Sequence, residues 1–345
     1  MTAPSKPPFK PGLLALALVA GLGLPGAMAA EVNVYSARHY DSDRDLYDGF
    51  REATGIRVNV IEAGGDALIA RMKAEGRNSP ADVFLTVDAG NLWRAQSEGL
   101  FQPAHSRLLS ERIPAHLRHP EDYWFGFSTR ARAIFVNPAK IDPARVASYA
   151  DLADPGLKGQ LCMRTSGAIY NLSLMGALIE RWGVEKAEAW AKGVVANFAR
   201  EPQGNDTSQL KSVASGECGA TIANHYYFIR LGASNDEGDR AAADALRLVW
   251  PDQGGQGTHL NISGGGVLAS APHRAEAVAF LEYLAGDAAQ AIVSEGNYEF
   301  PAVAAVPRPS ALAALGPFEA DTVNVAVYGE NQARAQEIYD RAGWR

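Results

Sequence analysis

The chain has 345 residues, of which 32 are Lys or Arg and 39 are Asp or Glu, so its formal net charge at pH 7 is −7. This acidic balance argues against a nucleic-acid partner, because nucleic-acid-binding proteins present a basic face. After the first 30 residues, no stretch of the sequence is long and apolar enough to span a bilayer.

The first 29 residues have the pattern of a secretory signal peptide. Lys6 and Lys10 make the start positive, a short apolar run covers 13–24, and Ala27-Met28-Ala29 matches an A-x-A cleavage site. Its removal leaves 30 basic and 39 acidic residues, a net charge of −9. We therefore expect an exported protein, and the lack of a Cys just after the cleavage point speaks against a lipoprotein.

The first part of the mature chain predicts the order β-α-β-α-β. The predicted elements are strands at 32–36, 56–60 and 82–86, with helices from 41 or 42 to 54 and from 64 to 76. Asp41 or Ser42 is expected to cap the first helix, and Asp66 to cap the second. This order implies a parallel α/β sheet that is covered on both faces.

Two apolar runs, 132–136 and 261–268, are predicted to cross between two domains. The elements predicted after the first run are a strand at 160–163, a helix carrying Tyr170, a helix at 182–197, a buried strand at 219–223, a helix pair from 273 to 293 and a last helix at 332–341. We interpret the glycines at 264–266 as a flexible hinge, in preference to an anion pocket formed with His259.

The roughly 310 residues of the mature chain exceed what one core usually holds, so two domains with a cleft are expected. The predicted first domain contains residues 30–130 and 262–296. The predicted second domain contains residues 131–261 and 297–345.

Cysteine usage agrees with export. The sequence has two cysteines, Cys162 and Cys218, in a compartment that permits disulfides. We predict that they pair, because a metal site built on two cysteines without a CxxC motif is the weaker interpretation. The bridge would join the strand before Tyr170 to the strand before Tyr226.

Tyrosines follow several of the predicted strands. Arg38-His39-Tyr40 comes after the first strand, Tyr170 comes after the strand at 160–163, and Asn224-His225-Tyr226-Tyr227 is predicted as a loop after the strand at 219–223. In open α/β sheets, ligands bind where strands end. Phenolate oxygen is a hard anionic ligand that suits small, highly charged cations, so the sequence predicts a cation site with ferric iron as the first candidate. His225 is expected to face away from this site.

The organisation and these motifs resemble the periplasmic ferric-iron-binding proteins of ABC transporters, the bacterial transferrins. The resemblance is carried by 33–50, 73–84, 158–170 and 222–227. It implies a type II, two-domain periplasmic substrate-binding protein of mixed α/β structure. It also implies a monomer that acts in the periplasm, is not an enzyme, and delivers iron to an ABC permease in the inner membrane.

Within this family the sequence is similar to the tyrosine-rich subgroup, in which no bound anion is required. The resemblance implies five ligands and one neighbouring cation. The implied ligands are His39, Tyr40, Tyr170, Tyr226 and Tyr227, and the cation is Arg38, which would offset phenolate charge or donate a hydrogen bond to a ligand oxygen. Other subgroups use a carboxylate near the second strand's end, but Glu62 and Asp66 are left out here. The sixth ligand (water, carbonate or none) stays open, and so does the choice between Fe(III) and Fe(II).

Two other functions compete with iron binding. The same fold could bind an organic solute such as a polyamine or a phosphorylated compound, with the tyrosines as stacking walls. A secreted hydrolase would need Ser166 or Ser263 beside a His, but neither serine lies in a G-x-S-x-G motif.

Overall fold

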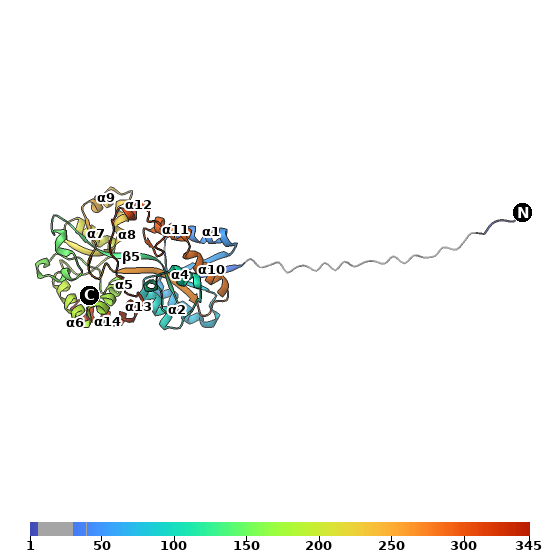
Figure 1. The fold of residues 1–345 in the computed structure, drawn as a ribbon, viewed down its shortest axis with the longest axis horizontal. Coiled ribbons are helices and arrows are strands. Elements are labelled where there is room, and N and C mark those ends of the chain that lie inside the picture. The colour runs from blue at the N-terminus through green and yellow to red at the C-terminus, as the bar shows by residue number, and fades with distance from the viewer. Residues whose placement is uncertain (6–29, 39) are drawn as a thin grey trace.

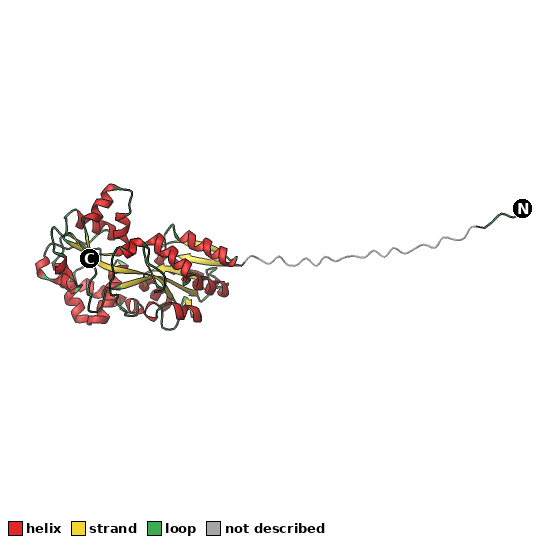
Figure 2. Ribbon diagram, turned by 45° about the horizontal axis from the view of Figure 1, so that its top comes forward, coloured by secondary structure: helices red, strands yellow, loops and turns green. Residues whose placement is uncertain are grey.

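The structure is a computed structural model that describes residues 1–5, 30–38 and 40–345. Most of the predicted signal peptide (6–29) and His39 therefore lie outside the described residues. The described part forms two lobes joined by long strands, and each lobe has helices around a shared sheet (Figures 1 and 2).

The first lobe begins with the predicted β-α-β-α-β order. Its elements are β1 (Glu31–Ser36), α1 (Asp43–Thr54), β2 (Arg57–Glu62), α2 (Gly65–Glu75), η1 (Gly76–Asn78), β3 (Val83–Val87), α3 (Ala89–Ser97), β4 (Phe101–Gln102), α4 (Arg107–Arg112), η2 (Ala115–Leu117), α10 (Arg274–Leu284) and α11 (Asp287–Asn297). Strand β1 pairs in parallel with both β2 and β3, which confirms the predicted parallel sheet. Val32 and Val34 alternate along β1 and therefore share one face of the sheet, where both are fully buried.

Two long, fully buried strands carry the sheet from one lobe to the other: β5 (Phe125–Val136) and β8 (Leu260–Leu268). The first half of β5 pairs antiparallel with β8, and its second half pairs with β6 (Ala220–Asn224) and β7 (Arg247–Val249). The two predicted crossing strands are thus confirmed, and β5 begins seven residues before the predicted run. The resulting sheet is mixed, because β8 runs antiparallel to β3.

The second lobe is mainly helical around β6 and β7. Its further elements are η3 (Pro143–Val146), η4 (Ala150–Ala153), η5 (Pro155–Leu157), α5 (Ile169–Trp182), α6 (Val184–Ala196), α7 (Asp206–Ala214), α8 (His225–Gly232), α9 (Glu237–Asp244), β9 (Phe300–Pro301), α12 (Ser310–Ala313) and α14 (Gln332–Ala342). In Figure 1, α13 (Ala326–Glu330) lies between the lobes, and α14 lies beside α6 in the second lobe.

Three of the local predictions were wrong. The expected strand at 160–163 is a single bridge residue, Leu161, which pairs with Phe198 and Ala220, so no ladder extends along it. Ser42 holds the N-cap position of α1, but its hydroxyl donates to Asn297 Oδ1 (2.8 Å) and does not cap the helix. Asp66 does not cap α2 either, because its exposed carboxylate pairs with Arg94 on the next helix.

Each lobe has its own apolar core. The larger core includes Val34, Phe84 and Trp124, whereas the second lobe is centred on buried side chains from β5, β6, α5 and α6. Val303 and Tyr328 pack with the larger core of the first lobe, although both belong to the predicted second domain. The residue boundaries predicted for the two domains therefore stay a prediction.

Asp88, which follows β3, links the two lobes through hydrogen bonds beside the crossing strands. Its buried carboxylate accepts hydrogen bonds from Ser173 Oγ on α5 (2.6 Å) and from Asn261 Nδ2 on β8 (2.8 Å). Burial raises the pKa of Asp88 to about 6, although these hydrogen bonds oppose the shift. One carboxylate thus contacts the first lobe, the second lobe and a crossing strand.

The glycines of β8 have a packing role that the hinge interpretation missed. Gly264, Gly265 and Gly266 lie in the extended strand and none has a positive φ. A Cβ on Gly265 would lie 2.6 Å from the Phe84 carbonyl oxygen, and a Cβ on Gly264 would overlap the carbonyl oxygen of Phe125. Neighbouring strands approach so closely here that a side chain does not fit.

We expect Gly265→Ala to lower the free energy of unfolding by about 1–3 kcal/mol, because the added methyl group overpacks the sheet. Urea denaturation of the purified protein measures this change. Gly64→Ala is the matched control, since nothing lies within 4 Å of a Cβ at Gly64. Equal stabilities of the two variants would contradict the packing role.

Candidate metal site

Four tyrosine phenols from both lobes gather at one place. Tyr40 follows β1, Tyr170 lies in the first turn of α5, and Tyr226 and Tyr227 lie in the first turn of α8. The Tyr170 and Tyr226 hydroxyl oxygens are 3.4 Å apart, and the ring centroids of Tyr226 and Tyr227 are 4.3 Å apart. Arg230 joins Tyr40 to this group, because its guanidinium carbon lies 5.2 Å from the Tyr40 ring and 4.8 Å from the Tyr226 ring.

Tyr226 and Tyr227 are presented by a helix, and the predicted loop at 224–227 was wrong. Asn224 holds the N-cap position of α8 but its side chain does not cap the helix. Instead, Asn224 Oδ1 accepts from Arg132 Nη1 (3.3 Å), and Asn224 Nδ2 donates to the Tyr226 hydroxyl (3.3 Å). A residue that would ordinarily begin a helix is thus used to hold a phenol.

The phenols are neutral at neutral pH in the absence of a cation. Burial raises the pKa of Tyr40 and of Tyr170 to about 12, and it raises the pKa of Tyr226 and Tyr227 as well. The neighbouring phenols Tyr170 and Tyr40 raise the pKa of Tyr226 further, because nearby phenolates repel, whereas the hydrogen bond with Tyr226 lowers the pKa of Tyr170 and opposes the effect of burial. A strong cation among these oxygens would favour the ionised form.

Guanidinium groups surround the phenols. The arginines whose guanidinium carbons lie within 6 Å of one of these tyrosine rings are Arg38, Arg130, Arg132, Arg164 and Arg230. Sequence reasoning identified Arg38 alone. Two of the others, Arg130 and Arg132, occupy fully buried positions of β5, and a charged residue within an apolar strand was the available signal. The positive charge of these arginines can offset the negative charge of several phenolates.

Arg38, the cation expected next to the site, lies beside Tyr40. It is buried, and its guanidinium carbon is 5.0 Å from the Tyr40 ring. Its Nε and Nη2 donate to the two oxygens of Asp43 at 2.8 and 2.9 Å, so its fork is directed at that carboxylate. In this structure Arg38 therefore contributes charge beside the phenol.

Glu299 is a buried carboxylate next to the site that sequence reasoning missed. It accepts hydrogen bonds from Ser128 Oγ and from Arg130 Nη2 (2.8 Å), and it lies 4.0 Å from Arg38 Nη1. Burial by itself would raise its pKa, but the charges of Arg130 and Arg38 and these hydrogen bonds hold the pKa at about 2. Glu299 is thus ionised and joins a first-lobe arginine to a crossing-strand arginine.

The remaining candidates lie as follows. His39 lies outside the described residues. Glu62 is exposed at the end of β2. His225 is turned away from the phenols, as predicted, but by a helix: its Nδ1 accepts from the Ala131 amide (3.1 Å) and its Nε2 donates to the Tyr298 carbonyl (2.8 Å). Since Nδ1 is an acceptor here, the ring is neutral, and burial lowers its pKa to about 4.

Neither serine proposed for a hydrolase has the surroundings of a nucleophile in the described part of the chain. Ser263 Oγ accepts from Arg130, and Ser166 Oγ accepts from Gln336 (3.4 Å). No described histidine forms a hydrogen bond with either serine. Among the residues that the structure describes, the hydrolase interpretation therefore has no supporting geometry.

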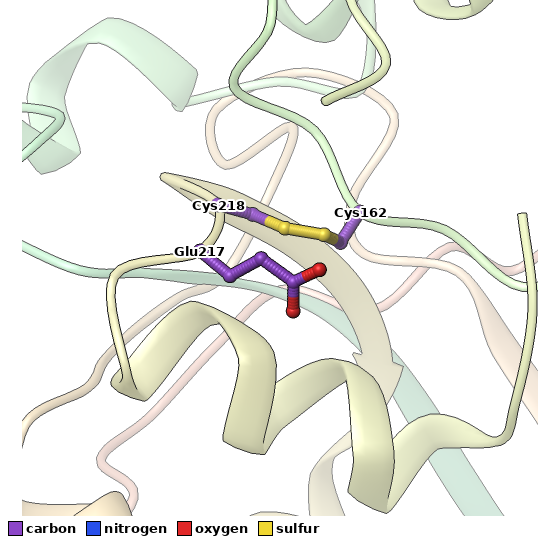
Figure 3. A group of neighbouring side chains, drawn as sticks. All are labelled: Cys162, Glu217 and Cys218. Atoms are coloured by element: carbon purple, nitrogen blue, oxygen red, sulfur yellow. A yellow bond between two sulfur atoms is a disulfide. The ribbon is translucent and has the colours of Figure 1, made fainter. Parts of the chain in front are cut away.

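The predicted disulfide between Cys162 and Cys218 is present (Figure 3). Both residues are fully buried, and their Cα atoms are 5.8 Å apart. Glu217 lies close enough to form a metal-like cluster with them. The sulfurs are bonded to each other, however, so they offer no thiolate ligand, and the cluster is a covalent link.

Among the residues that the structure describes, no helix has the length and apolar character needed to cross a membrane.

Comparisons with known proteins agree with this architecture. The model of the family described as bacterial extracellular solute-binding protein matches residues 78–316. Iron uptake protein A1 of Synechocystis is 47% identical over 315 residues, covering 91% of this chain and 88% of that protein. The Fe(3+)-binding periplasmic protein of Serratia marcescens is 31% identical over 335 residues, covering 96% of each chain.

Solved structures give the same result. A Trichodesmium protein (IdiA, FutA) in complex with iron and citrate ligands has a TM-score of 0.90 at 52% identity, covering 92% of this chain and all of that one. The ferric binding protein from Campylobacter jejuni has a TM-score of 0.85 at 39% identity, covering 91% of this chain and all of that one. The chain therefore belongs to the bacterial extracellular solute-binding protein family, within the group that contains these iron uptake and ferric iron-binding proteins.

Proposed function

We propose that this protein binds Fe(III) between its lobes through the phenolates of Tyr40, Tyr170, Tyr226 and Tyr227, with His39 as a fifth ligand. The observation that carries the proposal is the convergence of four phenols from both lobes on one place. Hard anionic oxygens suit a trivalent ion, and few other functions require four neighbouring phenols. The relatives named above, whose names record iron uptake and ferric binding, support the same ligand.

The arginines account for how one small site can hold several phenolates. Fe(III) balances three negative charges, so a fourth phenolate leaves an excess of one. Arg38 and Arg130 are each paired with a carboxylate, whereas Arg132 and Arg164 share one, Asp206. This leaves a net positive charge near Tyr170 that can offset the excess without an external anion. The site as we propose it holds Fe(III) in preference to Fe(II), because the lower charge would leave more phenolate charge unbalanced.

The role we propose is capture and delivery without a chemical reaction. Iron would draw ligands from both lobes and so stabilise the closed arrangement. A monomer in this state would be recognised in the periplasm by the permease of an ABC importer, which would receive the iron. The export signal at 1–29 and the family membership support this location.

A visible spectrum with ferric iron supplied as a weak chelate tests the proposal. A phenolate-to-iron charge-transfer band that saturates at one equivalent is the expected result. Failure to bind iron would contradict the proposal and favour an organic solute. In that case a phosphorylated compound fits better than a polyamine, because the arginines around the rings would repel a polycation. Stoichiometric ferrous binding without a band would retain iron and change its oxidation state.

We expect ferric affinity to fall as pH falls. Because burial raises the pKa of Tyr40 and Tyr170 to about 12, both phenols are protonated in the iron-free protein and must release protons to bind the metal. Each proton released lowers the apparent association constant about tenfold per pH unit of acidification. Competition titrations against a chelator at several pH values measure the slope, and a pH-independent affinity would contradict phenolate coordination.

A further inference from the structure

Asp206 is a buried carboxylate that joins two of the segments carrying phenols. It is the first residue of α7 and is completely buried. Its Oδ2 accepts from Arg132 Nη1 (2.6 Å) and from the Asn224 backbone amide (2.9 Å), and its Oδ1 accepts from Arg164 Nη1 (3.0 Å). Three donors from β5, the end of β6 and the 164–170 segment thus meet on one side chain.

Two of these donors lead to Tyr170. The guanidinium carbons of Arg164 and Arg132 lie 5.3 and 5.7 Å from the Tyr170 ring. Arg132 Nη2 also donates to Asn171 Oδ1 (2.9 Å), in the residue that follows Tyr170 on α5. Because both cations are held by the same carboxylate, Asp206 determines where positive charge lies against this phenol.

The third donor leads to Tyr226. Asp206 holds the Asn224 backbone, and the Asn224 side chain donates to the Tyr226 hydroxyl (3.3 Å). Tyr226 in turn lies 3.4 Å, oxygen to oxygen, from Tyr170. A path of hydrogen bonds and ring contacts therefore runs from Tyr170 through the arginines and Asp206 to Tyr226.

The two arginines need this carboxylate. Arg132 is buried and Arg164 is mostly buried. Two adjacent buried guanidinium groups without an anion would repel each other and move apart, or admit water. Either change would displace the groups packed on Tyr170.

We propose that Asp206 is a positioning residue of the iron site, which sets Tyr170 and Tyr226 at the separation that a shared metal ion requires. This proposal rests on the proposed function. Asp206 is not proposed as a ligand: its oxygens are taken up by Arg132, Arg164 and the Asn224 amide. It acts through the groups that touch the phenols.

The test is Asp206→Asn in the full mature chain, which preserves the shape of the side chain and removes its charge. Outer-sphere partners of metal ligands typically contribute 10–100-fold in affinity, so we expect ferric affinity to fall by about that factor. We also expect the phenolate-to-iron band to move in energy or lose intensity, since the band depends on how the phenolates face the ion. Chelator competition and visible spectroscopy give these two values.

Asp321→Asn is the matched control. Asp321 is also a buried carboxylate that accepts from an arginine, Arg181, and from a backbone amide, that of Val323 (2.8 Å), but none of these partners contacts the four phenols. We expect it to lower thermal stability in the same way and to leave affinity and band unchanged. A purely structural role of Asp206 predicts that the two variants behave alike at the iron site.

Arg164→Gln keeps the proposal testable if Asp206→Asn does not fold. Arg164 is the more exposed of the two arginines, and its loss removes one cation from Tyr170, so a smaller fall in affinity with a moved band is expected. Wild-type ferric affinity and an unchanged band in whichever of Asp206→Asn and Arg164→Gln folds would overturn the positioning role alone. A lack of iron binding by the unaltered protein would overturn the proposed function and the positioning role with it.

Discussion

Replacement of both Tyr226 and Tyr227 by phenylalanine is expected to abolish tight ferric binding and the charge-transfer band while the fold persists. The variant keeps both rings and loses the two adjacent phenolate oxygens. A directly bound ligand contributes at least as much as an outer-sphere partner, for which about 100-fold is the upper typical value, so the two losses together should exceed about 10⁴-fold. Equilibrium competition against a ferric chelator measures the change.

The fold should survive this double replacement because packing is preserved. The Tyr226 ring is buried and its packing is retained, and the hydrogen bond that the Tyr226 hydroxyl accepts from Asn224 has a typical net value of about 1 kcal/mol. Tyr123→Phe combined with Tyr283→Phe is the matched control, since it removes two phenol oxygens of the first lobe that lie outside the cluster. Retention of wild-type ferric affinity in the Tyr226/Tyr227 variant would contradict the proposed site.

Removal of the disulfide should have the largest effect on stability. Cys162 and Cys218 are 56 residues apart, so the bond restricts a long loop in the unfolded chain. The chain-entropy model assigns about 4 kcal/mol to a loop of this length. We therefore expect the double replacement by alanine to lower the free energy of unfolding by about 4 kcal/mol, as measured by urea denaturation.

The same bond lies close in the chain to the iron site. Cys162 precedes the segment that carries Arg164 and Tyr170, and Cys218 precedes β6, which ends next to Tyr226.

Reduction is the control for the stability prediction. Wild-type protein treated with a reductant should resemble the alanine variant in stability. Unchanged stability in both would show that the loop is already restricted without the bond.

Several features follow from local pattern alone, and the sequence was sufficient for them. The β-α-β-α-β order, the two crossing strands and the placement of Tyr40 and of Tyr226-Tyr227 after strands depend on residue periodicity and on neighbours close in the chain. The cysteine pairing followed from there being only two cysteines in an exported chain. Tyr40, Tyr170, Tyr226 and Tyr227 could be named because phenols after predicted strands are a chemical signal in themselves.

Only the tertiary structure decided what surrounds those phenols. Arg130, Asp206 and Glu299 are far apart in the sequence, and only the packing of the strands and helices brings them to the phenols. The glycines of β8 likewise reflect a close approach of strands that no local pattern records. The Asn224 side chain forms hydrogen bonds with Arg132 and Tyr226 and does not cap α8. Phenol identity is a property of single residues, whereas the charge balance that makes a phenolate site workable depends on groups from distant segments, and only folding places those groups within a few ångströms of one another.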